Sequence, residues 1–336
     1  MRNGVARVFI AGDWDADGVV STALMTYSQE KLGMYPLKSK AVVYKKPVDL
    51  ENIETIFRDL RGKYELVVFL DIPFSNKVFG ILKLLRQHFN IEKIMYVDHH
   101  LSTVNNAGLL SEVVDIVIVK QGVSTSRLVY DEVTKQGISL PNRLRVFVEV
   151  VEYMDIGKRI PNTHMKIFEI VKLISKALTL RRDPVLWEKI VEWLISPLPL
   201  SLEDDLLKQL KNTIEEWDKE VESVALDLAI SAVKIGDYRF VDARRRWRRR
   251  GASALASKLY SILKAPVIVW VDTAKEYSLL VIKASGGKAY RLAKMLVSDG
   301  VALDVAGHPN MAIAKIPRSI SKEELINTLR KCVFRI

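Results

Sequence analysis

The sequence is poor in cysteine: Cys332 is the only one among 336 residues. A single thiol cannot form an internal disulfide, and it cannot build a cysteine-based zinc site. Any metal must therefore be held by aspartate, glutamate or histidine side chains. Oxygen and imidazole ligands favour Mg²⁺ or Mn²⁺ over ions that prefer thiolates.

Long apolar runs are also missing. No stretch reaches the roughly 20 apolar residues that span a bilayer, and the N-terminus lacks a basic region followed by a signal-like apolar stretch. We therefore expect a cytoplasmic protein that does not contact membranes. The 51 Lys and Arg residues outnumber the 40 Asp and Glu residues, which gives a net charge of +11. This balance suits a polyanionic partner, although it also serves general solubility.

The first part of the chain alternates strand-like and helix-like segments. Short apolar strands separated by helices are typical of a parallel sheet covered on both faces. We expect strands at Val5–Ala11, Ala41–Tyr44, Leu66–Leu70, Lys93–Val97 and Val113–Val119. We expect helices at Val19–Lys31, Asn76–Phe89 and Ser124–Lys135, and helical periodicity continues from Asn142 to about Ile195.

A second α/β domain follows a long connecting helix. Pro197 and Pro199 interrupt the helical pattern, and an amphipathic helix is then predicted at Leu202–Leu228, bridging the two domains. The predicted division is a catalytic domain at 1–195, a linker and bridging helix at 196–229, and a smaller domain at 230–336. The smaller domain has predicted strands at Ala232–Ile235, Tyr238–Val241, Pro266–Asp272 and Ser278–Ala284, and helices at Ala252–Leu263, Lys288–Leu296 and Lys322–Lys331.

Acidic and imidazole groups follow three of the predicted strands. They are Asp13, Asp15 and Asp17 after the first, Asp71 after the third, and Asp98-His99-His100 after the fourth. Carboxyl ends of parallel strands share one edge, where ligands bind. Crowded carboxylates repel one another, and a pair of divalent cations removes that cost while serving phosphoryl chemistry. Taken singly, Asp17 could cap a helix, Asp71 could belong to a turn, and Asp98 could orient a surface histidine.

These motifs resemble the DHH phosphoesterase superfamily. Gly12–Leu24 (GDWDADGVVSTAL) resembles the first motif of RecJ-type single-strand exonucleases, in particular their archaeal branch, and Asp98-His99-His100 resembles the triplet that names the superfamily. Val67–Asp71 fits the second motif, and Met154–Gly157 fits the fourth. The resemblance covers most of the chain. It implies an N-terminal DHH domain and a C-terminal DHH-associated substrate domain.

The resemblance also implies roles for individual residues. The implied metal ligands are Asp15, Asp17, Asp71, His99 and Asp155, holding two divalent cations, with Mn²⁺ favoured and Mg²⁺ as the alternative. The implied catalytic groups are His100 facing the phosphate, Asp98 fixing a histidine tautomer, and Asp13 supporting the loop or touching a metal-coordinated water. One departure is Ala11, which stands where many members of the superfamily have a histidine.

Two stretches of the second domain are expected to contact substrate. Gly307 and His308 match the end of the glycine-rich turn of DHH-associated domains, and Ser285, Gly286 and Gly287 resemble an upstream contact stretch. An ordinary strand-to-helix turn and a structural histidine are the alternatives. A second feature is an arginine cluster, from which Arg244, Arg245, Arg246 and Arg248 are expected to bind phosphates and Trp247 to stack on a base. A solvated loop or protein-docking patch is the alternative.

The sequence therefore predicts a two-metal phosphodiesterase that acts as a single-strand exonuclease on DNA or RNA, in replication or repair. Two alternatives remain open at this point. One is a phosphoesterase of small substrates, such as short oligonucleotides or a nucleotide bisphosphate. The other is a replisome subunit related to RecJ that binds the GINS complex or a helicase and has little catalytic activity.

Overall fold

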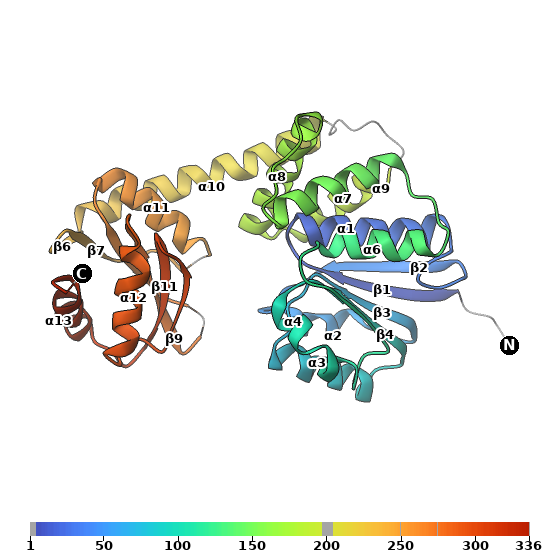
Figure 1. Cartoon of the computed structure of the whole chain (residues 1–336), viewed down its shortest axis with the longest axis horizontal. Helices are drawn as coiled ribbons and strands as arrows, with labels where there is room; N and C mark the ends of the chain where they lie inside the picture. The colour runs from blue at the N-terminus through green and yellow to red at the C-terminus, as the bar shows by residue number, and fades with distance from the viewer. Residues whose placement is uncertain (1–4, 197–203, 249, 274, 336) are drawn as a thin grey trace. The chain divides into compact units, whose positions relative to one another are not determined.

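The computed structural model describes residues 5–196, 204–248, 250–273 and 275–335. They form two compact units, Met1–Thr213 and Ile214–Ile336. The division falls inside the long helix α10 (Asp204–Ile230), which joins the units along the chain (Figure 1). Pro197, Pro199 and the predicted helix start at Leu202 lie outside the described residues.

The first unit contains a five-stranded sheet in the order β2-β1-β3-β4-β5, and all neighbouring strands are parallel. Its strands are β1 (Ala6–Gly12), β2 (Ala41–Pro47), β3 (Tyr64–Leu70), β4 (Ile91–Asp98) and β5 (Ile116–Val119). The predicted parallel α/β fold is thus confirmed. Because the strands are parallel, the carboxyl ends of β1, β3 and β4 lie along one edge of the sheet.

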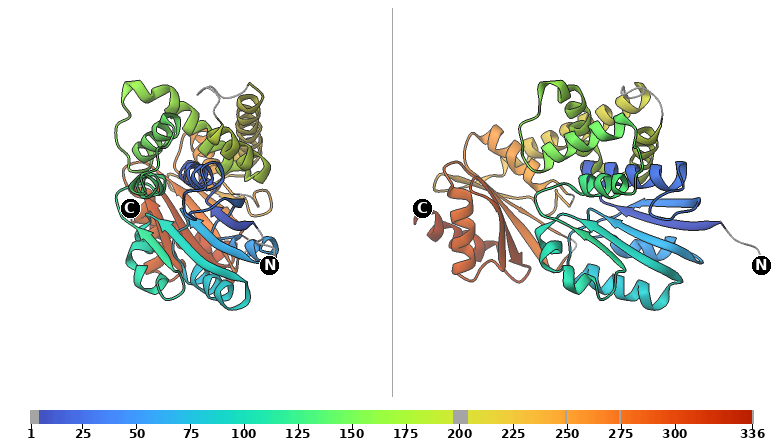
Figure 2. Two further views of the ribbon diagram at one scale, coloured as in Figure 1. Left: turned by 90° about the vertical axis from the view of Figure 1, so that its right-hand side faces the viewer. Right: turned by 45° about the vertical axis from the view of Figure 1, so that its right-hand side comes forward.

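Helices cover both faces of this sheet, as Figures 1 and 2 show, with α1 and α6 on one face and α2 and α3 on the other. The helices of the unit before α10 are α1 (Ala16–Thr26), α2 (Ile56–Asp59), α3 (Asn76–His88), α4 (Leu101–Asn105), α5 (Ala107–Leu110), α6 (Thr125–Lys135), α7 (Asn142–Asp155), α8 (Met165–Arg181) and α9 (Pro184–Ile195). A π-helical turn, Tyr27–Lys31, extends α1.

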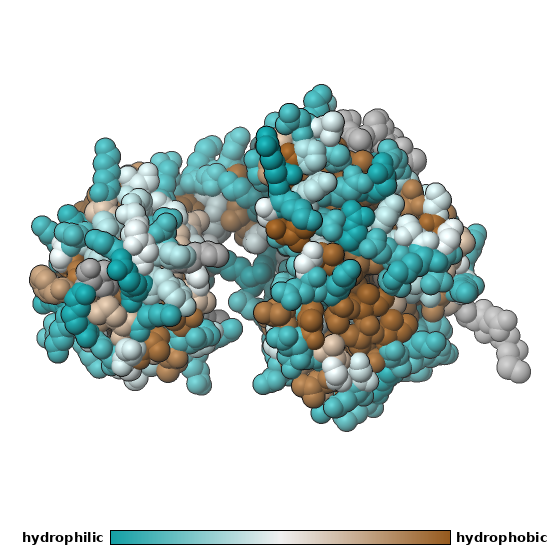
Figure 3. Space-filling model, viewed as in Figure 1, coloured by the Kyte–Doolittle hydropathy of each residue, from teal (hydrophilic) through white to brown (hydrophobic). Residues whose placement is uncertain are grey.

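Residues of the central strands of this sheet are more deeply buried than those of the edge strand β5. Residues of the central strands, such as Ile10, Val68 and Tyr96, have no exposed surface, as a strand packed on both faces requires. All four residues of the edge strand β5 are only half-buried. Figure 3 shows a broad apolar area on the visible face of the first unit, amid hydrophilic surface.

The second unit is built on a mixed six-stranded sheet in the order β10-β11-β9-β8-β7-β6. Its strands are β6 (Val233–Ile235), β7 (Tyr238–Asp242), β8 (Val267–Val271), β9 (Tyr277–Lys283), β10 (Asp304–His308) and β11 (Met311–Pro317), and its further helices are α11 (Ala252–Leu263), α12 (Lys288–Ser298) and α13 (Lys322–Val333). The pair β7–β8 is parallel, whereas the other neighbours are antiparallel.

Strands β10 and β11 are absent from the elements that the sequence predicts. Strand β11 alternates buried and half-buried residues, but two of its buried positions are Ala312 and Ala314. Alanine is depleted in strands, so it hides the alternation. Among the described residues, no helix combines the length and apolar character that crossing a bilayer requires.

Candidate metal centre

The loop after β1 is held in a tight turn by hydrogen bonds between the Asp15 side chain and the loop backbone. The Asp15 Oδ1 atom accepts hydrogen bonds from the backbone N–H groups of Asp17 (2.9 Å) and Gly18 (3.1 Å), and so caps the start of α1. A Cβ atom on Gly18 would lie 2.5 Å from the Asp13 carbonyl oxygen. Glycine is therefore required for the loop to turn back on itself.

Helix α9, from a distant part of the sequence, also stabilises this loop by a hydrogen bond. The buried Trp187 donates its indole N–H to the Asp13 carbonyl oxygen at 3.0 Å. No local pattern signals this contact, because the two residues are 174 positions apart. Ala11, where many DHH proteins have a histidine, is fully buried in β1 and offers no ligand atom.

Asp17 is anchored by the N-terminus of α6. Its two carboxylate oxygens accept the backbone N–H groups of Thr125 (2.7 Å) and Ser126 (2.8 Å). Burial, reinforced by the charge of Asp15, raises the pKa of Asp17 from 3.8 to about 7. The two helical N–H groups stabilise the anion only in part, so the site favours an additional positive charge.

Asp71 follows β3 in a strained conformation, with a φ angle of 63° that non-glycine residues rarely adopt. Such strain is typical of functional positions. The side chain is buried, and its Oδ1 atom accepts the Thr125 hydroxyl at 2.9 Å. Burial and then the negative charges of Asp17 and Asp15 raise the pKa of Asp71 well above its usual value.

The triplet after β4 places its two imidazoles differently. The Nε2 atom of His99 lies 3.4 Å from Asp71 Oδ1 and 4.0 Å from Asp17 Oδ2. The Nδ1 atom of His100 lies 2.7 Å from Asp98 Oδ1. Although burial alone would lower the pKa of His100, the hydrogen bond and charge of the fully buried Asp98 outweigh it and raise that pKa. Asp98 also accepts the Thr103 hydroxyl.

Asp155, the last residue of α7, completes the cluster. Its Oδ2 atom lies 3.4 Å from Nδ1 of His99, and burial raises its pKa. A helix outside the sheet, α7, therefore places the Asp155 carboxylate beside the residues at the sheet edge.

All the acidic and imidazole residues predicted for the site are thus brought together in the first unit. Three groups have ligand atoms within 4.8 Å of one another, and each can hold a cation: Asp71, His99 and His100; Asp17, His99 and Asp155; Asp13, Asp15 and Asp71. The donor set of oxygens and imidazoles suits Mn²⁺ or Mg²⁺. Buried carboxylates with raised pKa values are the signature of a site that lacks counter-charge, so divalent cations fit it.

Sequence reasoning missed the start of α6 as part of this site. Thr125 contacts two of the acidic residues, through its N–H group and its hydroxyl. The available signal was Ser124, whose side chain caps α6 by accepting the Arg127 N–H at 3.2 Å. That pattern predicts a helix N-terminus, and helix N-termini attract anions, but it does not say which anion.

The arginine cluster of the second unit differs from the prediction for Trp247. Its ring is 2% exposed and packs edge-on against Trp217 of α10, with ring centroids 5.6 Å apart. The expectation that Trp247 stacks on a base is therefore wrong, because neither face of the ring is open to solvent. Arg244 is held by Asp242, whereas Arg245, Arg246 and Arg248 are exposed.

The two glycine-containing stretches lie side by side. Gly287, at the start of α12, donates its N–H to the Asn310 side chain at 3.0 Å, and Ala284 donates to the Asn310 carbonyl at 3.2 Å. Gly286 and Gly287 have positive φ angles of 64° and 73°. A Cβ atom on Gly307 would lie 2.4 Å from the Met311 carbonyl oxygen. Ser285 and the backbone of His308 belong to the same corner, and their substrate contact stays a prediction.

No family model and no curated protein matches the sequence. Solved structures match the fold. The DHH domain of a protein described as a member of a family of ribosomal proteins superposes with a TM-score of 0.58 at 15% identity, over 98% of this chain and 87% of the other.

Two exonuclease structures also match. RecJ from Thermus thermophilus, in complex with Mn²⁺, gives a TM-score of 0.54 at 15% identity over 97% of this chain, which spans about half (51%) of the RecJ chain. A second structure of the exonuclease RecJ, bound to manganese, gives 0.51 at 13% identity, over 97% and 89% of the two chains. At these identities the likeness concerns the fold alone: the chain shares with these structures an arrangement of two α/β units.

Proposed function

We propose that the protein is a metal-dependent phosphodiesterase that degrades single-stranded nucleic acid from an end. The observation that carries the proposal is the convergence of seven acidic and imidazole side chains at one sheet edge, with three overlapping ligand groups among them. Two solved structures of this fold, both of RecJ, are described as bound to manganese. Mn²⁺ is accordingly the first cation to test, and Mg²⁺ the second.

In this proposal Asp15, Asp17, Asp71, His99 and Asp155 hold the cations. Bound divalent cations would supply Lewis-acid stabilisation of the negative charge that develops on the phosphoryl and leaving oxygens. The chain's own residues fix the ligands: Asp15 closes the loop, and Thr125 anchors two carboxylates.

His100 has a separate part in the proposal. Its Nδ1 atom is held by Asp98, and the imidazole lies 4.0 Å from Asp71 Oδ1, at the margin of the site. A raised pKa keeps the ring cationic over a wider pH range. We assign it to hydrogen-bond a phosphate oxygen through Nε2 and to donate a proton to the leaving oxygen.

A strand of several nucleotides is the preferred substrate over a dinucleotide because the second unit exposes Arg245, Arg246 and Arg248 close together in sequence. Neutralising several phosphates makes binding strongly dependent on salt. A substrate of one or two nucleotides would engage few of these charges.

The test is digestion of single strands labelled at either end, with Mn²⁺, with Mg²⁺ and with a chelator. We expect mononucleotides to be released one at a time from one labelled end when a divalent cation is present, and no release in the chelator. A dinucleotide supplied at the same concentration should be cut more slowly than a long strand. Faster hydrolysis of the dinucleotide would instead favour a small-substrate phosphoesterase, and inertness with either cation would refute an enzymatic role.

A further inference from the structure

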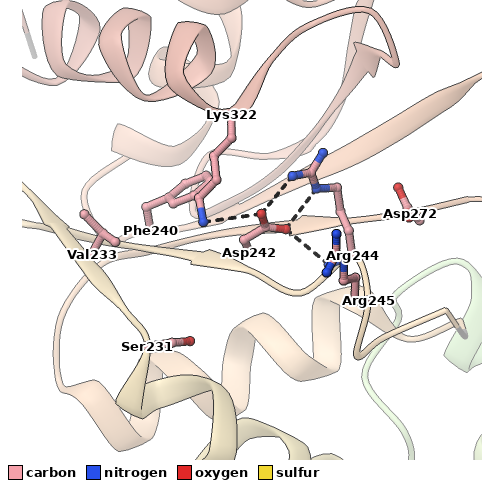
Figure 4. Close-up of a pocket in the computed structure, with 8 residues that line it drawn as sticks. All are labelled: Ser231, Val233, Phe240, Asp242, Arg244, Arg245, Asp272 and Lys322. Atoms are coloured by element: carbon pink, nitrogen blue, oxygen red, sulfur yellow. Dashed lines mark hydrogen bonds and ion pairs between the residues drawn. The ribbon is translucent and has the colours of Figure 1, made fainter.

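A second pocket lies wholly within the second unit, at the carboxyl ends of the parallel strands β7 and β8 (Figure 4). Its volume is about 530 Å³, within the range of small-molecule sites (~300–1,000 Å³). Asp242 ends β7, Asp272 follows β8, and Lys322 begins α13. Ligands characteristically bind beyond the carboxyl ends of parallel strands.

This pocket is separate from the glycine corner of the same unit. In the antiparallel pair β8–β9, Val267 lies opposite Lys283 and Val271 lies opposite Leu279. Ser285 and the glycines follow Lys283, so they lie at the opposite end of the sheet from Asp272. The two ends of β8 are about 13 Å apart.

Arg244 is fixed in the pocket as a flat platform. Its Nε and Nη2 atoms donate to the two carboxylate oxygens of Asp242, at 2.9 and 2.8 Å, which is the paired geometry that guanidinium matches best. Its guanidinium carbon lies 3.4 Å from the centroid of the Trp270 ring. Trp270 is buried, and its indole N–H is held by Ser278 at 2.7 Å.

The guanidinium group of Arg244 has one face against Trp270, which leaves its other face for a ligand. One face of the guanidinium is covered by Trp270, and the Arg244 side chain retains 30% exposure at the pocket wall. Figure 4 shows Lys322 and Arg244 meeting the same carboxylate, that of Asp242. Lys322 is drawn to Asp242 (3.5 Å), whereas Arg245 is exposed and has no ion-pair partner in the described parts of the chain.

A planar cation with an open face is a stacking surface for a nucleobase. Its fixed orientation removes the entropy cost of ordering a free arginine side chain. An unpaired arginine beside it supplies the counter-charge for a phosphate. Both arginines line the same pocket, so the base and the phosphate of one nucleotide can contact them together.

We propose that this pocket binds one nucleotide unit, with the base stacked on the open face of Arg244 and the phosphate paired with Arg245. The unit is either a free mononucleotide or one residue of a single strand. This site does not depend on the metal centre. In this proposal a base stacks on Arg244, which is backed by Trp270, and not on Trp247 as the sequence predicted.

The test is calorimetric titration of the full chain in a chelator, which keeps hydrolysis out of the measurement. The probes are AMP, ribose 5-phosphate, adenosine and a short single strand. AMP should bind about tenfold more tightly than ribose 5-phosphate, because stacking contributes on that scale. Competition between AMP and the strand would show that the strand enters the same pocket, and independent binding would restrict the site to free nucleotides.

Two variants separate the parts of the site. Arg244→Lys keeps the charge but cannot form the flat paired platform, so AMP should lose about tenfold in affinity and ribose 5-phosphate should change little. Arg245→Ala should weaken AMP and ribose 5-phosphate equally and leave adenosine unchanged. Lys234→Ala removes an exposed charge of β6 outside the pocket and is the control.

Equal affinity for AMP and ribose 5-phosphate would overturn the proposal. An equal loss of AMP affinity in Arg245→Ala and Lys234→Ala would overturn it as well. Either result would mean that the unit attracts anions only through its general charge. Because Arg245 is exposed, its variant is expected to fold even if Arg244→Lys does not. Failure here would leave cation-dependent hydrolysis at the first unit untouched, so it is distinguishable from failure of the proposed metal centre.

Discussion

Asp71 in the first unit directly follows the parallel strand β3, and Asp242 in the second is the last residue of β7. Burial alone would raise the pKa of each. Asp242 is compensated by the hydrogen bonds and charge of Arg244, so its pKa falls below the usual value. Asp71 is surrounded by further acids, and its pKa rises. Asp242 thus has its counter-charge within the second unit, whereas for Asp71 the proposed function assigns that part to bound cations.

The largest expected effect of this difference is on activity. Asp71→Asn and His99→Ala each remove a proposed ligand, and we expect cation-dependent hydrolysis to fall by more than ~100-fold, since even outer contacts of metal sites cost 10- to 100-fold. Asparagine tolerates the left-handed backbone at this position. Rates on a labelled single strand measure the effect, with Asp131→Asn, an exposed acid of α6, as the control.

The same substitution should stabilise the cation-free protein. Asp71→Asn removes a buried acid whose ionised form is disfavoured by burial and by Asp17 and Asp15, so near pH 8 its Tm in a chelator should exceed that of the wild type by a few degrees. Loss of hydrolysis together with a lower Tm would mean that Asp71 is a structural residue, and would count against the proposed metal centre.

A smaller loss of activity is expected at the start of α6. Thr125→Val keeps the backbone N–H that binds Asp17 but removes the hydroxyl that binds Asp71. Hydrolysis should fall by roughly 10- to 100-fold, and the cation concentration for half-maximal rate should rise, because Asp71 is no longer oriented. Thr125→Ser should restore both quantities. Equal defects in the valine and serine variants would show that the hydroxyl does not orient the ligand.

Local sequence patterns predicted most of the elements, but not this contact. Asp17 and Thr125 are 108 positions apart, and only the packing of α6 on α1 brings them together. Convergence of Asp71 with His99 was predictable, because parallel strands must end on one edge. The burial of Trp247 was not predictable, since the arginines around it suggested a solvent-exposed loop while its neighbour Trp217 comes from the distant helix α10.

The stability of the cation-free first unit should also depend on pH. The folded protein raises the pKa of Asp17 from 3.8 to about 7, so a proton is bound more tightly in the folded than in the unfolded state. The contribution of Asp17 to the stability of the cation-free protein is therefore most favourable at acid pH and declines as the pH rises from 3.8 through about 7. Cations compete with this proton.

Thermal unfolding with and without Mn²⁺ measures the consequence. The increase in Tm on adding Mn²⁺ should be small near pH 5.5 and several degrees near pH 8 (~2–4 °C per kcal/mol of binding energy). An increase that does not depend on pH would mean that Mn²⁺ binds groups other than these buried acids.

The smallest expected effect is in the second unit, and its sign is opposite. Asp242→Asn removes the counter-charge of Arg244, so the guanidinium loses its paired hydrogen bonds and the protein should lose roughly 1 kcal/mol of unfolding free energy. Because the pKa of Asp242 is lowered in the folded state, its contribution is present above the unfolded-state pKa and disappears at acid pH. The free energies of unfolding in urea of the wild type and the variant should therefore differ near pH 7, and the difference should shrink as the pH falls below 3.8. Destabilisation by Asp242→Asn but stabilisation by Asp71→Asn, both without cations, would establish that one unit carries its own positive charge and the other does not.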